Sequence, residues 1–190
     1  MTIQQTILHI DDELSGILRD YEEWFRLTPE MLRFKPHDRW SIEQILEHVT
    51  LTNHFLLILI RKGTRKAKDS ALKSDLNQAV SNYEYNLEAL DQIARHNSFK
   101  WIRPEHMEPN GEKSTAEVKL LLEEQIEECQ QMLRQLPNGE GILYKTMMTV
   151  NNLGKIDVYQ YLYFLCLHAR RHISQMQGVM EEYRRFHTSQ

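Results

Sequence analysis

Two histidines stand four residues apart in the segment LHARRHISQ, residues 167–175. On a helix, a spacing of four places two side chains on one face, one turn apart. One helix can then offer two imidazole nitrogens to a single metal ion. The same spacing also fits two histidines that each hydrogen-bond to a neighbouring helix. The pair alone therefore leaves a metal site and a packed core equally open.

The surrounding residues indicate which way His168 and His172 point. Val158, Tyr161 and Leu165 form an apolar row by steps of three and four, and the two histidines continue it. We therefore expect both imidazoles to face the interior or its margin. A buried polar group without a partner costs about 1–3 kcal/mol, and a divalent ion would satisfy both. Position 169 is alanine, so the pair lacks the glutamate that acts as general base in HExxH zinc proteases.

A catalytic zinc site commonly has three protein ligands, so a third must come from elsewhere in the chain. His48 and His54 both lie in another strongly periodic segment. His48 has the more apolar neighbours on its face and is slightly preferred, but periodicity leaves His54 open. The other histidines are expected on the solvated surface: His9, His37, His96, His106 and His187.

Five segments with helical periodicity would position these residues: 3–24, 41–60, 72–90, 114–136 and 157–184. Capping boxes, which mark helix starts, occur at Ser41, Ser114 and Asp157, and Gly63 is the expected C-cap of the second segment. None of the segments shows the alternation of apolar and polar residues that is typical of a β-strand. The sequence therefore predicts an all-α fold, an antiparallel four-helix bundle with one extra helix. Segment 72–90 is the candidate for the extra helix.

Composition restricts the class of protein. The chain has 190 residues, and we expect one domain spanning 1–190. Its net charge of −4 argues against nucleic-acid binding, and the basic run at 61–68 reads as a helix end and a solvated loop. Cys129 and Cys166 read as small buried apolar residues in a reducing compartment. Without a signal peptide or an apolar run long enough to span a bilayer, a cytoplasmic protein without a membrane partner is expected.

Two blocks of the sequence resemble motifs of the DinB/YfiT-like superfamily. The segment RWSIEQILEHVTLTNHF, residues 39–55, is similar to its second-helix motif, in which a histidine follows a tryptophan by eight residues; here these are Trp40 and His48. The segment LGKIDVYQYLYFLCLHARRHISQMQ, residues 153–177, is similar to its last core helix, with the pattern H-x-x-[RH]-H-x-x-Q. That pattern places His168, His172 and Gln175. Residues 64–113 match no part of the motifs.

The resemblance implies a four-helix bundle with a metal ion held by His48, His168 and His172, in preference to His54. Three imidazoles suit zinc first, and nickel, iron and manganese also. Family members include enzymes that transfer a low-molecular-weight thiol and metal-dependent hydrolases, so we expect a small-molecule substrate, a thiol among the candidates. A non-catalytic metal-binding stress-response or regulatory bundle is the alternative. The resemblance also suggests a homodimer.

No catalytic base is identifiable from the sequence. Glu43 and Glu47 flank His48, but neither falls squarely on its helix face. Gln175, three residues beyond His172, is expected to orient that imidazole. For Tyr161, seven residues before His168, core packing is favoured over donation to a bound ligand.

Overall fold

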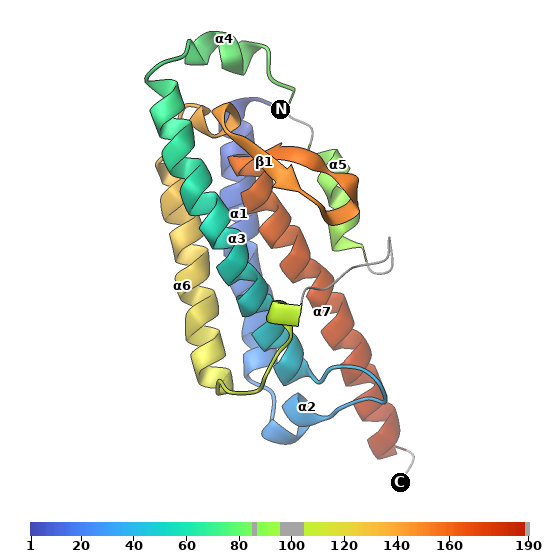
Figure 1. The fold of residues 1–190 in the computed structure, drawn as a ribbon. Coiled ribbons are helices and arrows are strands. Elements are labelled where there is room, and N and C mark those ends of the chain that lie inside the picture. The colour runs from blue at the N-terminus through green and yellow to red at the C-terminus, as the bar shows by residue number, and fades with distance from the viewer. Residues whose placement is uncertain (85–86, 96–104, 189–190) are drawn as a thin grey trace.

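Four long helices form the body of the protein in the computed structural model, which describes residues 1–84, 87–95 and 105–188. They are α1 (Ile3–Phe25), α3 (Ile42–Ala71), α6 (Thr115–Arg134) and α7 (Val158–Thr188) (Figure 1). Their apolar faces meet in one buried core. The predicted all-α bundle is therefore confirmed. Within the described residues, no helix is both long and apolar enough to cross a bilayer.

The helices form a ring in which α3 contacts α6 and α7, and α1 contacts the same two. Helices α3 and α7 are antiparallel, as are α1 and α6. Helices α3 and α6 run parallel, because Glu43 bonds to Thr115 at their first turns and Lys68 bonds to Gln135 at their last. The long connection between α3 and α6 makes this possible, since it returns the chain along the bundle before α6 begins (Figure 1).

The three predicted capping boxes open the helices that they were expected to open. The Ser41 hydroxyl accepts from the Gln44 N–H, and the Gln44 side chain accepts from the Ser41 N–H. Ser114 begins α6 in the same way. Asp157 and Gln160 exchange the equivalent pair of bonds at the start of α7. These bonds satisfy N–H groups that a helix start leaves without helical partners.

The prediction that α3 ends at Gly63 was wrong, because the helix continues to Ala71. Gly63 is buried inside α3 where the helix passes the start of α7. A Cβ atom at this position would lie 2.9 Å from Val158 Cγ2. The glycine therefore permits a close helix contact and does not terminate the helix. The basic run at 61–68 is consequently helical throughout.

The predicted helix over 72–90 is also wrong. The chain instead forms two short helices, α4 (Leu76–Ser81) and α5 (Glu88–Asp91), followed by the 3₁₀ turn η1 (Gln92–Ala94). Asp75 caps α4 through the Gln78 N–H, so it starts a new helix. Another short helix, α2 (Pro29–Arg33), occupies the proline-containing stretch after α1.

A β-hairpin precedes α7, where no strand was expected. Strands β1 (Lys145–Met148) and β2 (Gly154–Asp157) pair antiparallel, with Met148 opposite Gly154. Asn151 and Asn152 in the connection have φ values of 48° and 54°, a conformation that asparagine tolerates better than most residues. The hairpin packs beside the first turns of α7 (Figure 1).

Candidate metal centre

Helix α3 places His48 inside the bundle, two turns after its capped start. The side chain is 5% exposed, and the Trp40 ring lies 4.7 Å from the imidazole, centroid to centroid. His48 Nδ1 is 2.8 Å from the backbone oxygen of Met107. A carbonyl can only accept, so Nδ1 carries the proton and donates. Nε2 is then the nitrogen with a lone pair available to bind a metal ion.

Helix α7 supplies the other two imidazoles. His168 and His172 are 4% and 5% exposed, so both face the interior as the apolar row predicted. Their Nε2 atoms lie 3.1 Å apart. His172 Nδ1 is 2.9 Å from Gln175 Oε1, which confirms the orienting contact expected for that glutamine. The bond fixes the His172 tautomer with Nε2 turned toward His168.

The structure brings His48, His168 and His172 together. Their ligand nitrogens all lie within 4.8 Å of one another. Two nitrogens that bind one zinc ion at about 2.0–2.1 Å stand roughly 3.3 Å apart, close to the separation of the α7 pair. The donor set and its spacing therefore fit a divalent ion held by three imidazoles. His54, the competing residue on α3, is exposed and lies outside this cluster.

Burial favours the neutral form of His168. The pKa of His168 lies well below its ordinary value, chiefly because burial disfavours the imidazolium. Positive charge on His172, His48 and Arg171 would lower that pKa further. Neutral imidazole is the form that binds metals, so burial favours the form of His168 that can act as a ligand.

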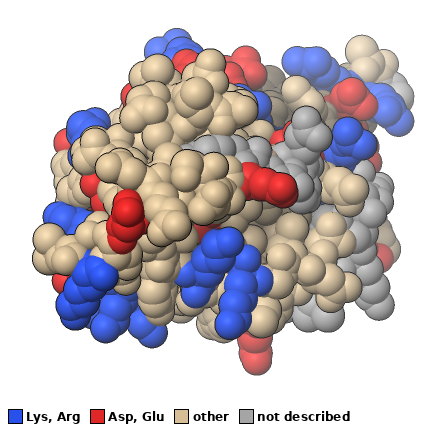
Figure 2. Space-filling model, turned by 90° about the horizontal axis from the view of Figure 1, so that it is seen from above, with Lys and Arg blue, Asp and Glu red and all other residues tan. Residues whose placement is uncertain are grey.

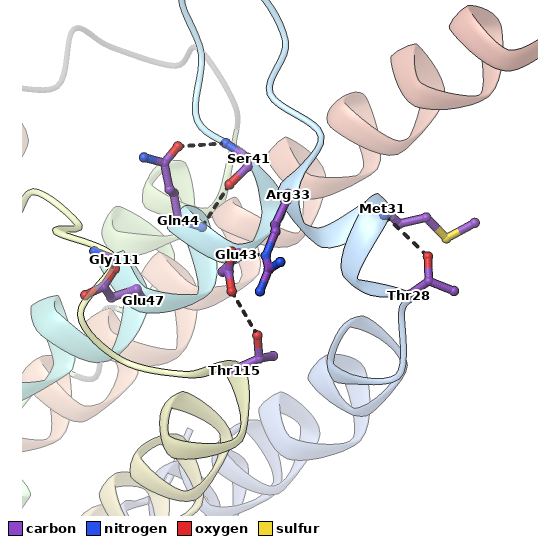
Figure 3. A network of polar contacts seen from close by, with 9 residues as sticks. All are labelled: Thr28, Met31, Arg33, Ser41, Glu43, Gln44, Glu47, Gly111 and Thr115. Atoms are coloured by element: carbon purple, nitrogen blue, oxygen red, sulfur yellow. Dashed lines mark hydrogen bonds and ion pairs between the residues drawn. The ribbon is translucent and has the colours of Figure 1, made fainter.

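The segment before α6 supports His48 in a way that the sequence did not reveal. Glu47 is 2% exposed, and its Oε2 accepts a 2.9 Å bond from the Gly111 N–H (Figure 3). Thr52 Oγ1 lies 3.8 Å from Met107 Sδ in the same segment. The segment 107–111 is thus attached to α3 through the Met107 side chain and the Gly111 N–H, as well as through the carbonyl that receives His48. The acceptor is a backbone carbonyl, which every residue has, so the sequence could not identify this contact.

The two glutamates that flank His48 do not face the histidine cluster. Glu47 points to Gly111, and Glu43 accepts from Thr115 and lies 3.6 Å from Arg33 (Figure 3). Neither carboxylate lines the space in front of the histidines. As the sequence indicated, neither glutamate is positioned to act as a catalytic base at the histidine cluster.

A cavity of about 620 Å³ opens in front of the three histidines, and we call it the histidine cavity. Its walls are mainly apolar and include Phe55, Leu56, Met107, Met147, Met148 and Phe164. Two of these methionines belong to the β-hairpin, so the element missed in the sequence forms one wall. The imidazoles lie at the wall of a space large enough for a small organic molecule.

Tyr161 helps to hold that wall in place. Its hydroxyl donates a 2.9 Å bond to the Met147 backbone oxygen, and burial raises its pKa to about 12. The side chain is 3% exposed, as expected for a packed residue, although it also borders the cavity. Tyr161 therefore ties the hairpin to α7 as a protonated phenol.

The remaining candidate residues lie apart from this centre. Cys129 and Cys166 are buried, as expected, and burial raises the pKa of both thiols. They remain protonated and do not line the histidine cavity. His106 is exposed and packs against Phe55, whereas His96 lies outside the described residues.

A known family matches most of the chain. The family model described as the DinB superfamily matches residues 13–176, which include both histidine-bearing segments. No match to the chain was found among curated proteins or among solved structures.

Proposed function

The chain belongs to the DinB superfamily, and we propose that it is an enzyme that uses a divalent metal ion held by His48, His168 and His172. One observation carries the proposal: three buried imidazoles converge at the wall of a cavity. Structural zinc sites are closed by four protein ligands, whereas catalytic sites leave a position for substrate. Zinc is the expected ion, and nickel, iron and manganese also suit imidazole ligands.

We favour transfer of a low-molecular-weight thiol over hydrolysis. A bound divalent ion would lower the pKa of a thiol or water beside it and so supply the nucleophile. Hydrolysis commonly adds a carboxylate or histidine as general base, and none of the described residues around the cavity is acidic. Thiols ionise far more readily than water and need less help from the protein.

The reaction balances without a further reactant. The thiol sulfur forms a bond to an electrophilic carbon of the second substrate, and the bond from that carbon to its leaving group breaks. The thiol proton passes to solvent, and the leaving group departs with the electron pair. The apolar walls of the cavity exclude water from the sulfur, which limits competing hydrolysis.

Metal content and turnover test the proposal together. The protein is purified without added metal, and its metal content is measured by elemental analysis. It is then assayed with a panel of thiols against 1-chloro-2,4-dinitrobenzene, and separately with 4-nitrophenyl esters. We expect one ion per chain and thiol transfer. His48→Ala should lose both, while the matched control His54→Ala, on the exposed side of the same helix, should keep both.

Each other result has a defined meaning. Ester cleavage without thiol transfer would show that the enzyme is a hydrolase and not a thiol transferase. A stoichiometric ion without turnover on either panel would favour the non-catalytic binding protein. An absence of bound metal, with His48→Ala leaving stability unchanged, would contradict the metal site itself.

A further inference from the structure

The histidine cavity meets solvent at two apolar side chains, which we call the apolar rim. Leu59 of α3 and Met147 of β1 both line the cavity, and they are 37% and 58% exposed. A single exposed apolar residue is ordinary on a protein surface, but these two border the same cavity. A ligand that enters between them therefore passes over apolar surface on its way to the imidazoles.

Buried apolar residues continue this surface inside the cavity. Leu56, Met148 and Phe164 line it and are 6%, 6% and 2% exposed. The unbranched side chain of Met148 is flexible and can adapt to ligands of different shape. No aspartate or glutamate is among the described residues of the lining. The carbon skeleton of a ligand would thus find apolar contacts from the rim inward.

Much of the polar lining is already engaged by the protein itself. Four polar side chains of the cavity wall contact other protein groups: Thr52 contacts Met107, Tyr161 contacts Met147, Arg171 contacts Arg95 and Gln175 contacts His172. A polar ligand group that enters the cavity loses its bonds to water and must compete with these internal contacts for a partner. A charged group loses still more hydration, whereas an apolar group gains by leaving water.

The residue next to Leu59 on α3 provides an internal comparison. Ile58 is 47% exposed, close to the exposure of Leu59, but it does not line the cavity. The two residues share a helix, an apolar side chain and partial exposure. They differ in whether they border the cavity, so a change at Ile58 reproduces the surface effect of a change at Leu59 without altering the rim.

We propose that the electrophilic substrate of the histidine cavity is an uncharged, mainly apolar molecule, and that Leu59 and Met147 determine this specificity at the rim. The inference rests on the proposed function and deepens it, because it assigns the chemical class of the second substrate of thiol transfer. The apolar contacts themselves need no metal ion, since the rim and the walls belong to the protein alone. They can therefore be measured with and without zinc.

A set of matched small ligands tests the assignment. Displacement of the fluorescent apolar probe N-phenyl-1-naphthylamine gives the affinities of 1-butanol, 1-hexanol, 1,6-hexanediol and hexanoate. In metal-free and zinc-loaded protein, we expect 1-hexanol to bind more tightly than 1-butanol by about fourfold per added methylene. In metal-free protein, the diol and hexanoate should each bind at least about tenfold more weakly than 1-hexanol, because a second hydroxyl or a charge loses water without an equivalent partner.

Two variants and a matched control locate the effect. Leu59→Glu and Met147→Glu each place a carboxylate on the rim and should weaken the binding of 1-hexanol at least about threefold. Both positions are partly exposed, so the fold should tolerate the change, and circular dichroism and zinc content check this. Ile58→Glu adds the same charge one residue away on α3 and should bind 1-hexanol as the wild type does.

The outcomes separate this proposal from the metal enzyme. Equal affinities across the ligand set, or wild-type affinity in both folded rim variants, would overturn the apolar substrate, and zinc binding by the same protein would leave the metal site standing. A rim variant that changes the oligomeric state in sedimentation velocity but not the affinity would also overturn it, because the rim would then contact a second copy of the chain. Chain-length dependence and rim effects in protein that binds no zinc would support the apolar site and contradict the metal enzyme.

Discussion

Helix α3 borders a cavity and a groove, and their polar groups differ in how deeply they are buried. Its first half borders the histidine cavity, where the three clustered imidazoles are buried. Its second half borders a groove with α6 of about 480 Å³, which we call the basic groove. The groove is lined by charged and amide side chains that include Arg61, Arg65, Lys68, Glu128, Gln131 and Gln135.

The charges of the basic groove are exposed and partly paired. Arg61 bonds to both carboxylate oxygens of Glu128, at 2.5 and 2.6 Å, yet the two side chains are 48% and 33% exposed. Lys68 bonds to Gln135. Seen from the end of the bundle where α3 stops, lysine and arginine side chains stand at the edge of the molecule among carboxylates (Figure 2).

This difference indicates where chemistry is expected. Water screens the charges of the basic groove, so its pairs contribute little to stability and hold no ligand strongly. In the histidine cavity, burial makes each polar group depend on a specific partner. The groove is the one with more charge, but the cavity is the one with a buried histidine cluster that could hold a metal ion.

The largest expected effect is the loss of zinc-induced stabilisation on removing a cavity histidine. At a free zinc concentration of 1,000 times Kd, binding stabilises the folded protein by about 4 kcal/mol. His168→Ala should abolish most of this gain, as measured by urea unfolding with and without zinc. His106→Ala, at an exposed histidine, is the control and should retain the gain. If both variants gain equally, His168 is not a ligand.

A smaller effect is expected for Glu47→Leu. This change removes the acceptor of the Gly111 N–H and loosens the segment whose Met107 carbonyl orients His48. Loss of such outer contacts typically weakens metal binding 10- to 100-fold, and we expect about tenfold here. Competition with a chromophoric zinc chelator measures the affinity.

Two variants control that measurement. Glu47→Gln retains an acceptor oxygen and should restore most of the zinc affinity. Glu43→Gln alters the partly exposed carboxylate near Arg33 and Thr115 and should leave the affinity unchanged. A normal zinc affinity in Glu47→Leu would show that the Met107 carbonyl keeps its place without this anchor.

The smallest effect is expected in the basic groove. Glu128→Gln should lower the free energy of unfolding by less than about 1 kcal/mol, because the pair with Arg61 is partly exposed. The hydrogen bond from Arg61 lowers the pKa of Glu128 from its ordinary value of 4.5. The pair therefore stabilises the fold above pH 4.5 and loses its contribution as pH falls through the lowered pKa.

Urea unfolding of wild-type protein and Glu128→Gln over an acidic pH series checks this. Their difference should be small at neutral pH and vanish in acid. A loss above about 2 kcal/mol would mean that the groove is better shielded from solvent than its exposed side chains indicate.

The sequence predicted the histidine centre because its signals are local. Each capping box fixes a helix start within four residues, and an apolar row fixes the face of His168 and His172. The choice between His48 and His54 was not local. It depended on a family motif, and the structure agrees by burying only His48 of the two.

The connection between α3 and α6 and the hairpin after α6 were not predictable in the same way. The apolar spacing over 72–90 fits a helix, but Asp75 and Asn82 divide it, and Leu90 is buried through tertiary contacts. Strands of four residues give too little alternation to detect. The pair Asn151–Asn152 is a turn signal that a closer reading of the hairpin could have used.

The separation of α3 and α7 in the sequence also bears on the order of folding. These two helices carry the histidines, so the histidine cluster forms only after a long loop has closed. Contacts of such long range form late in folding for many small proteins. A ligand that binds only the completed cluster would then slow unfolding while leaving the folding rate nearly unchanged. Zinc would thus act on the lifetime of the folded bundle and have little effect on how quickly it forms.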